Sequence, residues 1–126
     1  MRIPDELKYS SDHEWAAVES NRVRVGITDY AQDALGDVVF VDLPKVGTKV
    51  TVSQSIGEVE STKSVSEIYS PVSGTVVAVN DALGDSPQSI NEDPYGSGWI
   101  CEIELDDDNG VASLLDADGY RAITDH

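Results

Sequence analysis

Short apolar segments separated by turn residues constrain the fold of this chain more than any other feature. Val23, Val25 and Ile27 alternate with polar or small residues, the period-two pattern of a half-buried strand. Longer purely apolar runs, such as residues 38–41 and 76–79, span only four residues. Because a helix needs about 20 apolar residues to cross a membrane, the pattern predicts many short strands and no membrane span.

The same pattern places the individual elements along the chain. We predict extended segments at residues 23–27, 38–43, 49–52, 54–61, 64–70, 75–79 and 99–105. Thr28 can cap a short helix over residues 29–35, which Gly36 ends. A chain of 126 residues fits one domain, so residues 1–126 are expected to form a single, mainly β unit.

The tail is expected to form a C-terminal helix over about residues 111–124. Its apolar stripe would consist of Leu114, Leu115 and Ala122, with Gly119 weakening the middle. The acidic segment 106–110 before it is interpreted as a solvated linker. It lacks the spaced ligands and the terminal bidentate Glu of a calcium loop.

The charge balance narrows the choice of partners. Eight basic residues stand against 24 acidic ones, for a formal net charge of −16, which repels nucleic acid and anionic membranes. The acids are scattered along the chain, which favours adaptation to a salt-rich cytoplasm over a partner-specific acidic face. The N-terminal residues have no apolar signal core, so we expect a cytoplasmic protein.

Catalysis by the polypeptide itself is not expected. The single cysteine, Cys101, lies on the apolar face of the last predicted strand and is interpreted as a core residue. The two histidines, His13 and His126, do not make a metal site. The order of residues shows no Ser-His-Asp triad and no phosphate loop, so the sequence indicates a protein that is not an enzyme.

Lys63 is the residue best placed for chemistry. It stands where two extended segments meet, so we expect it at an exposed hairpin tip. Exposure would let a ligase reach the amine, and the strands behind it would present an attached arm. Considered alone, however, an ordinary surface lysine is the commoner explanation.

The surrounding motifs change that interpretation, because the sequence resembles the glycine cleavage H-protein family from about Leu7 to Ile103. The matching motifs are Lys8-Tyr9, His13-Glu14-Trp15, and residues 25–32, 35–44, 59–64, 70–74, 79–80 and 91–99. The family usually has Glu-Ser-Val-Lys-Ala where this chain has Glu60-Ser61-Thr62-Lys63-Ser64. The resemblance implies a barrel-sandwich hybrid of two small sheets with short flanking helices, and lipoic acid in amide linkage on Lys63.

The resemblance also implies a role and partners. Glycine decarboxylase would load an aminomethyl group onto the lipoyl arm, and an aminomethyltransferase would pass the one-carbon unit to tetrahydrofolate. Dihydrolipoyl dehydrogenase would then reoxidise the dithiol, and a lipoate ligase or lipoyltransferase would attach the arm. The family further implies a monomer that meets these enzymes transiently.

By the same resemblance, a surface cleft shelters the loaded arm, and acidic groups stabilise its amine. The candidates are Asp12, Glu14 and Glu67, although the family often has Ser and Asp at the first and last of these positions. His13 would line the same cleft or pack beside Trp15. Glu14 could instead be a simple surface acid.

Glu58 and Glu60 are candidate contacts for the ligase and partner enzymes, or else part of a solvated acidic face. Other carriers share a hairpin lysine, namely biotin carriers and the lipoyl domains of 2-oxoacid dehydrogenases. A biotin site would flank the lysine with Met, whereas Thr62 and Ser64 stand here. A dehydrogenase lipoyl domain would be shorter and followed by a flexible linker. An H-like protein that relays lipoyl groups to other enzymes is also compatible with the sequence.

The halophilic interpretation makes a prediction for thermal stability. Raising the salt concentration from about 0.1 M to about 1 M shortens the screening length from about 10 Å to about 3 Å, which should relieve self-repulsion. We expect the melting temperature, followed by circular dichroism, to rise over this range. A melting temperature that does not change with salt would contradict the interpretation.

Overall fold

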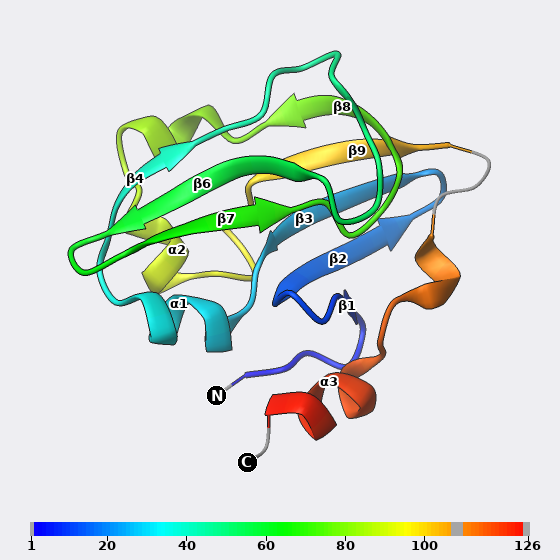
Figure 1. The fold of residues 1–126 in the computed structure, drawn as a ribbon, viewed down its shortest axis with the longest axis horizontal. Helices are drawn as coiled ribbons and strands as arrows, with labels where there is room; N and C mark the ends of the chain where they lie inside the picture. The colour runs from blue at the N-terminus through cyan, green and yellow to red at the C-terminus, as the bar shows by residue number, and fades with distance from the viewer. Residues whose placement is uncertain (1, 107–109, 125–126) are drawn as a thin grey trace.

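The computed structural model describes residues 2–106 and 110–124 and contains two antiparallel sheets (Figure 1). The larger sheet has the order β1-β2-β3-β9-β8-β5, and the smaller sheet has the order β4-β6-β7. The strands of the larger sheet are β1 (Lys8–Tyr9), β2 (Glu14–Glu19), β3 (Arg22–Ile27), β9 (Cys101–Leu105), β8 (Gly74–Val79) and β5 (Lys49–Val50). The smaller sheet consists of β4 (Val38–Asp42), β6 (Ser55–Ser61) and β7 (Val65–Tyr69). Neither described sheet closes on itself.

Short helices connect and cover these strands. They are α1 (Asp29–Leu35), η1 (Asp81–Gly84), α2 (Ser89–Glu92), η2 (Val111–Ser113) and α3 (Ala117–Thr124). The predicted helix at residues 29–35 is confirmed with both its ends. The Thr28 hydroxyl accepts a hydrogen bond from the Ala31 N–H at 3.2 Å, and Gly36 follows the last turn with φ of 83°. No helix in the described part of the chain is long and apolar enough to cross a membrane.

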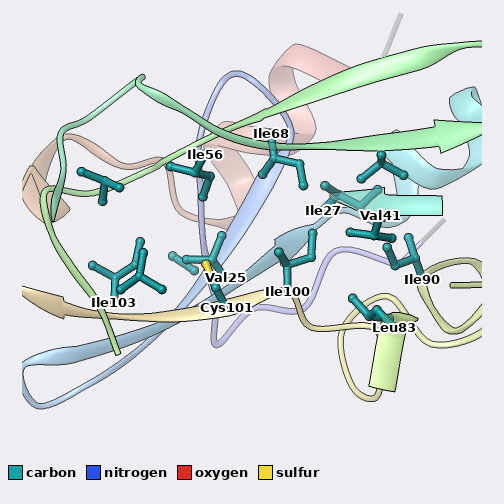
Figure 2. Close-up of a cluster of buried hydrophobic side chains, with 14 of the residues drawn as sticks. Val25, Ile27, Val41, Ile56, Ile68, Leu83, Ile90, Ile100, Cys101 and Ile103 are labelled. Atoms are coloured by element: carbon teal, nitrogen blue, oxygen red, sulfur yellow. The ribbon is translucent and has the colours of Figure 1, made fainter. Parts of the chain in front are cut away.

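The main core lies between the two sheets. Val25, Cys101 and Ile103 of the larger sheet face Ile56 and Ile68 of the smaller one (Figure 2). All five are buried, and Cys101 is inaccessible to solvent, which confirms its assignment to the core. Burial of this apolar surface is the main force that holds the two sheets together.

A second, smaller cluster lies on the other face of the larger sheet. Trp15 and Tyr120 are buried there together with Tyr9, whose ring stacks on that of Tyr120 with centroids 4.7 Å apart. Figure 1 shows why the cluster forms, since the C-terminal α3 passes beside β1. The strand β1 and the helix α3 are thereby packed together next to the start of β2.

The structure confirms a mainly β fold with short helices, and six predicted extended segments match strands to within a few residues. A seventh, at residues 99–105, begins two residues later, at Cys101. The sequence pattern predicted neither β1, which has only two residues, nor β2, whose sequence Glu-Trp-Ala-Ala-Val-Glu includes two alanines with little strand preference. The 3-10 helix η1 and the single turn α2 were also missed.

The predicted helix at residues 111–124 is wrong in its first half. Only η2 is helical there, and α3 begins at Ala117. Leu115 instead exchanges two backbone hydrogen bonds with Tyr9, at 2.7 and 2.8 Å, which a helix could not allow. The apolar residues that α3 buries are Ala117 and Tyr120, whereas Ala122 is exposed. The predicted linker at residues 106–110 and the second histidine, His126, lie wholly or partly outside the described residues.

Candidate functional site

Lys63 is exposed at the tip of the β6–β7 hairpin, as predicted (Figure 1, left). The Ser61 N–H donates to the Ser64 carbonyl at 2.8 Å, and the Ser61 hydroxyl oxygen accepts from the backbone N–H of Lys63 and Ser64. Thr62 donates its N–H to the Asp37 carbonyl at 3.1 Å, which ties the tip to the loop after α1. The lysine therefore stands on a turn whose backbone is fixed.

The stem of Lys63 lies against Gly36. A Cβ atom added at Gly36 would come within 3.3 Å of Lys63 Cε, and the glycine has a left-handed φ of 83°. A larger residue would be strained there and would crowd the lysine. The α1 C-terminus and the hairpin tip are thus held close together.

A cleft of about 320 Å³ opens beside this hairpin. Its walls come from α1, from β7 and from the segment that leads into β2. The lining residues are Asp12, His13, Glu14, Ile27, Tyr30, Ala31, Ala34, Leu35, Val59, Ser64, Val65, Ser66, Glu67 and Ile68. The structure thus brings together all four residues predicted to form the arm cleft, although the first three lie more than 50 positions from Glu67 in sequence.

Glu14 is the most unusual member of this group, because its side chain is only 2% exposed. One carboxyl oxygen accepts from the Ser10 hydroxyl at 2.7 Å, and the other from the Tyr69 N–H at 3.4 Å. Burial raises the pKa of Glu14 to about 8, despite these two hydrogen bonds, which lower it. Glu14 is therefore no surface acid, and with a pKa of about 8 it is largely protonated near neutral pH.

His13 has a left-handed φ of 73°, which turns the chain just before β2. Its imidazole packs against Tyr30, with centroids 4.7 Å apart, and its Nδ1 lies 2.8 Å from the Tyr120 hydroxyl. Burial lowers the pKa of His13, and the charge of Asp12 opposes that shift. Of its two predicted placements, the structure thus supports the cleft wall.

The other two acids lie at the rim of the cleft. Asp12 and Glu67 are both exposed, and Glu67 accepts a hydrogen bond from the Tyr69 hydroxyl at 2.8 Å. This contact raises the pKa of Tyr69 and fixes the position of the Glu67 carboxylate. The cleft therefore has a buried, protonatable acid inside and two exposed carboxylates at its mouth.

Glu58 and Glu60 do not line the cleft. They flank the buried Val59 on β6, so their side chains point to the outer face of the smaller sheet. In the strand register, Glu60 lies between Phe40 and Val65, which are 51% and 58% exposed. The two glutamates thus belong to a mixed apolar and acidic face next to Lys63.

Sequence reasoning missed the tyrosines around the cleft, Tyr30, Tyr69 and Tyr120. Tyr30 lies within a recognised motif and could have been proposed, whereas Tyr120 depends on the docking of α3. Cys101 has its thiol pKa raised to about 12 by burial, which does not suit a nucleophile. No group of three or more His, Cys, Asp or Glu side chains among the described residues is arranged to hold a metal ion.

A fold of two open sheets with one lysine on a hairpin tip beside a cleft defines a carrier-type domain. The family model described as glycine cleavage H-protein matches residues 7–126. The chain belongs to the glycine cleavage H-protein family.

Individual proteins that resemble this chain support the same family assignment. The chain is 60% identical to the glycine cleavage system H protein of Micrococcus luteus over 124 residues, which cover 97% of each chain. It is 55% identical to the H protein of Myxococcus xanthus over 121 residues, 96% of this chain and 94% of that protein. The crystal structure of a glycine cleavage system H protein from Mycobacterium marinum matches with a TM-score of 0.91 at 44% identity, covering 98% of this chain and all of that one.

The raised pKa of Glu14 predicts a pH-dependent stability. Between the usual glutamate pKa of 4.5 and about 8, the folded protein binds more protons than the unfolded chain, so the free energy of unfolding falls as pH rises. In Glu14→Gln this contribution is lost. The free energy of unfolding of the variant minus that of wild type, measured by urea unfolding, should therefore increase by about 2 to 4 kcal/mol from about pH 5 to about pH 9.

Glu67→Gln is the matched control, because it removes an exposed carboxylate from the same cleft. Its stability should follow the pH dependence of wild type. If the Glu14→Gln and wild-type profiles run parallel, the buried carboxyl does not titrate as described.

Proposed function

We propose that this chain is the lipoylated carrier of the glycine cleavage system, with lipoic acid joined to Lys63 as an amide. The observation that supports this most directly is the position of Lys63, exposed on a fixed hairpin tip beside the cleft, within a chain of the H-protein family. Membership over residues 7–126 favours this role over a biotin carrier or a dehydrogenase lipoyl domain. The protein acts as a carrier component rather than as a catalyst.

The residues around Lys63 fit such an arm. The amine is free of the hairpin's own hydrogen bonds, which all use backbone groups or the Ser61 hydroxyl. The cleft of about 320 Å³ is of a size that binds small molecules. A lipoyl group on Lys63 would supply a disulfide whose S–S bond is broken by the electron pair that decarboxylation of glycine releases, so that one sulfur would carry the aminomethyl group and the other would become a thiol; the dithiol would remain once the group has been passed on.

The chain's own residues then hold and shelter the arm. Leu35, Val65 and Ile68 form apolar walls that exclude water from the bound end. Glu14 and the rim carboxylates of Asp12 and Glu67 attract its cationic amine. Burial raises the pKa of Glu14 to about 8, and the positive charge of an ammonium group beside it would lower that pKa, so Glu14 would release its proton and pair with the amine.

The partners follow from this role. Glycine decarboxylase loads the arm, the aminomethyltransferase unloads it, and dihydrolipoyl dehydrogenase reoxidises it in the cytoplasm. A monomeric carrier meets each enzyme in turn, while the tether keeps the reacting group at roughly millimolar effective concentration. Glu58 and Glu60 provide the docking contacts for these enzymes and for the lipoate ligase or lipoyltransferase.

Intact mass before and after incubation with lipoate, ATP and a lipoate ligase tests the proposal. We expect a gain of one lipoyl group, with peptide mapping placing it on Lys63. The gain should be absent from Lys63→Arg and retained in Lys49→Arg, a matched control because Lys49 is also exposed on a strand. Unmodified wild type, or modification of another lysine, would refute the assignment.

A further inference from the structure

Three hydrogen-bonding side chains connect the C-terminal helix to the cleft. His13 Nδ1 lies 2.8 Å from the Tyr120 hydroxyl, and this hydroxyl lies 2.7 Å from Thr28 Oγ1. Thr28 in turn accepts from the Ala31 N–H at the start of α1, which forms one cleft wall. The imidazole of His13 is thus linked through Tyr120 to two helices.

The chemistry of the three groups determines which of them donates in each hydrogen bond. Thr28 is completely buried, so its hydroxyl hydrogen needs a partner inside the protein, and the Tyr120 oxygen provides one. Tyr120 then donates its own hydrogen to His13 Nδ1, an acceptor only in a neutral ring that carries its proton on Nε2. A hydrogen bond made to the neutral form disfavours the charged form.

The surroundings of His13 contain opposing influences. Asp12 and Glu14 adjoin it in sequence, Tyr30 faces it from α1, Tyr120 from α3, and Glu67 lies across the cleft on β7. Ionised Asp12 favours an imidazolium, whereas burial disfavours one. The hydrogen bond from the Tyr120 hydroxyl opposes protonation of the ring. If that hydroxyl is removed, the carboxylates around the cleft are less strongly opposed, and the ring is protonated more readily.

We propose that Tyr120 is a positioning residue that keeps His13 neutral, so that the cleft presents no positive charge to a cationic arm. This inference rests on the proposed function, since only a loaded arm brings an amine into the cleft. An imidazolium at this place would repel that amine and offset the attraction of Asp12, Glu14 and Glu67. The C-terminal helix thereby contributes to the cleft without lining it.

The first test is the tautomer and titration of His13, measured by 15N NMR of histidine-labelled protein in a His126→Asn background. In the protein with Tyr120 unchanged, we expect the neutral ring of His13 to carry its proton on Nε2. Tyr120→Phe should raise the pKa of His13 by about 0.4 to 1, the effect of losing one ordinary hydrogen bond. A proton on Nδ1, or a fall in the His13 pKa in Tyr120→Phe, would overturn the proposal.

Tyr9→Phe is the matched control. The Tyr9 ring stacks on Tyr120, but its hydroxyl donates to the Pro4 carbonyl at 2.6 Å, away from His13. The His13 pKa should be unchanged in this variant, and an equal shift in both variants would overturn the proposal. If Tyr120→Phe does not fold, the tautomer of the protein with Tyr120 intact still decides the direction of the hydrogen bond.

The second test follows hydrolysis of the loaded arm against pH. As the pH falls, hydrolysis in Tyr120→Phe should accelerate at a higher pH than in wild type and Tyr9→Phe, because more of His13 is then charged. Identical pH profiles for the two variants would overturn the role of Tyr120 in arm binding. A further outcome is that the loaded arm of wild type is hydrolysed as fast as the same aminomethyl group on free lipoamide while the His13 tautomer is as predicted. That result would contradict the proposed sheltering of the arm in the cleft and would support the positioning of His13 by Tyr120.

Discussion

The packing of Trp15 across Gly26 is the contact on which the functional region depends. The two residues are paired in adjacent strands, and a Cβ atom at Gly26 would come within 2.6 Å of the indole ring. The indole N–H donates to the Pro94 carbonyl at 2.8 Å, and Trp15 is 1% exposed. Because Trp15 fixes the start of β2, the two residues before it, His13 and Glu14, are fixed at the cleft.

Burial of Glu14 then determines the electrostatics of the cleft. An ionised carboxylate in this position loses most of its hydration, and the hydrogen bonds from Ser10 and Tyr69 only partly offset that loss. The cleft therefore favours the protonated form of Glu14 near neutral pH. A buried acid of this kind costs stability near neutral pH, which is typical of groups retained for function.

Much of the fold could be predicted because local signals were strong. Thr28 and Gly36 defined α1, and β-branched alternation defined strands such as β3. The failures have physical causes: β2 contains alanines, and the backbone of Leu115 pairs with Tyr9 in place of extending a helix. Local patterns carry no information on such long-range contacts.

The candidate site, like the fold, could be predicted from the sequence only in part. Lys63 at a hairpin tip followed from the two extended segments around it, whereas its modification was inferred from family resemblance. The same resemblance grouped Glu14 with Glu67, 53 positions away, and no spacing rule could have done so. The burial of Glu14 and the link from His13 to Tyr120 required the folded structure, because they depend on the docking of α1, α3 and β7.

The most direct test of the account is to locate the loaded arm. Glycine labelled with 13C at its methylene carbon, processed by glycine decarboxylase on the lipoylated protein, would place one labelled group at the end of the arm. If the arm lies in the cleft, we expect 13C-filtered nuclear Overhauser contacts from this group to Tyr30, Val65 and Ile68. A labelled group with no contacts to the cleft and the mobility of a free chain would contradict the account.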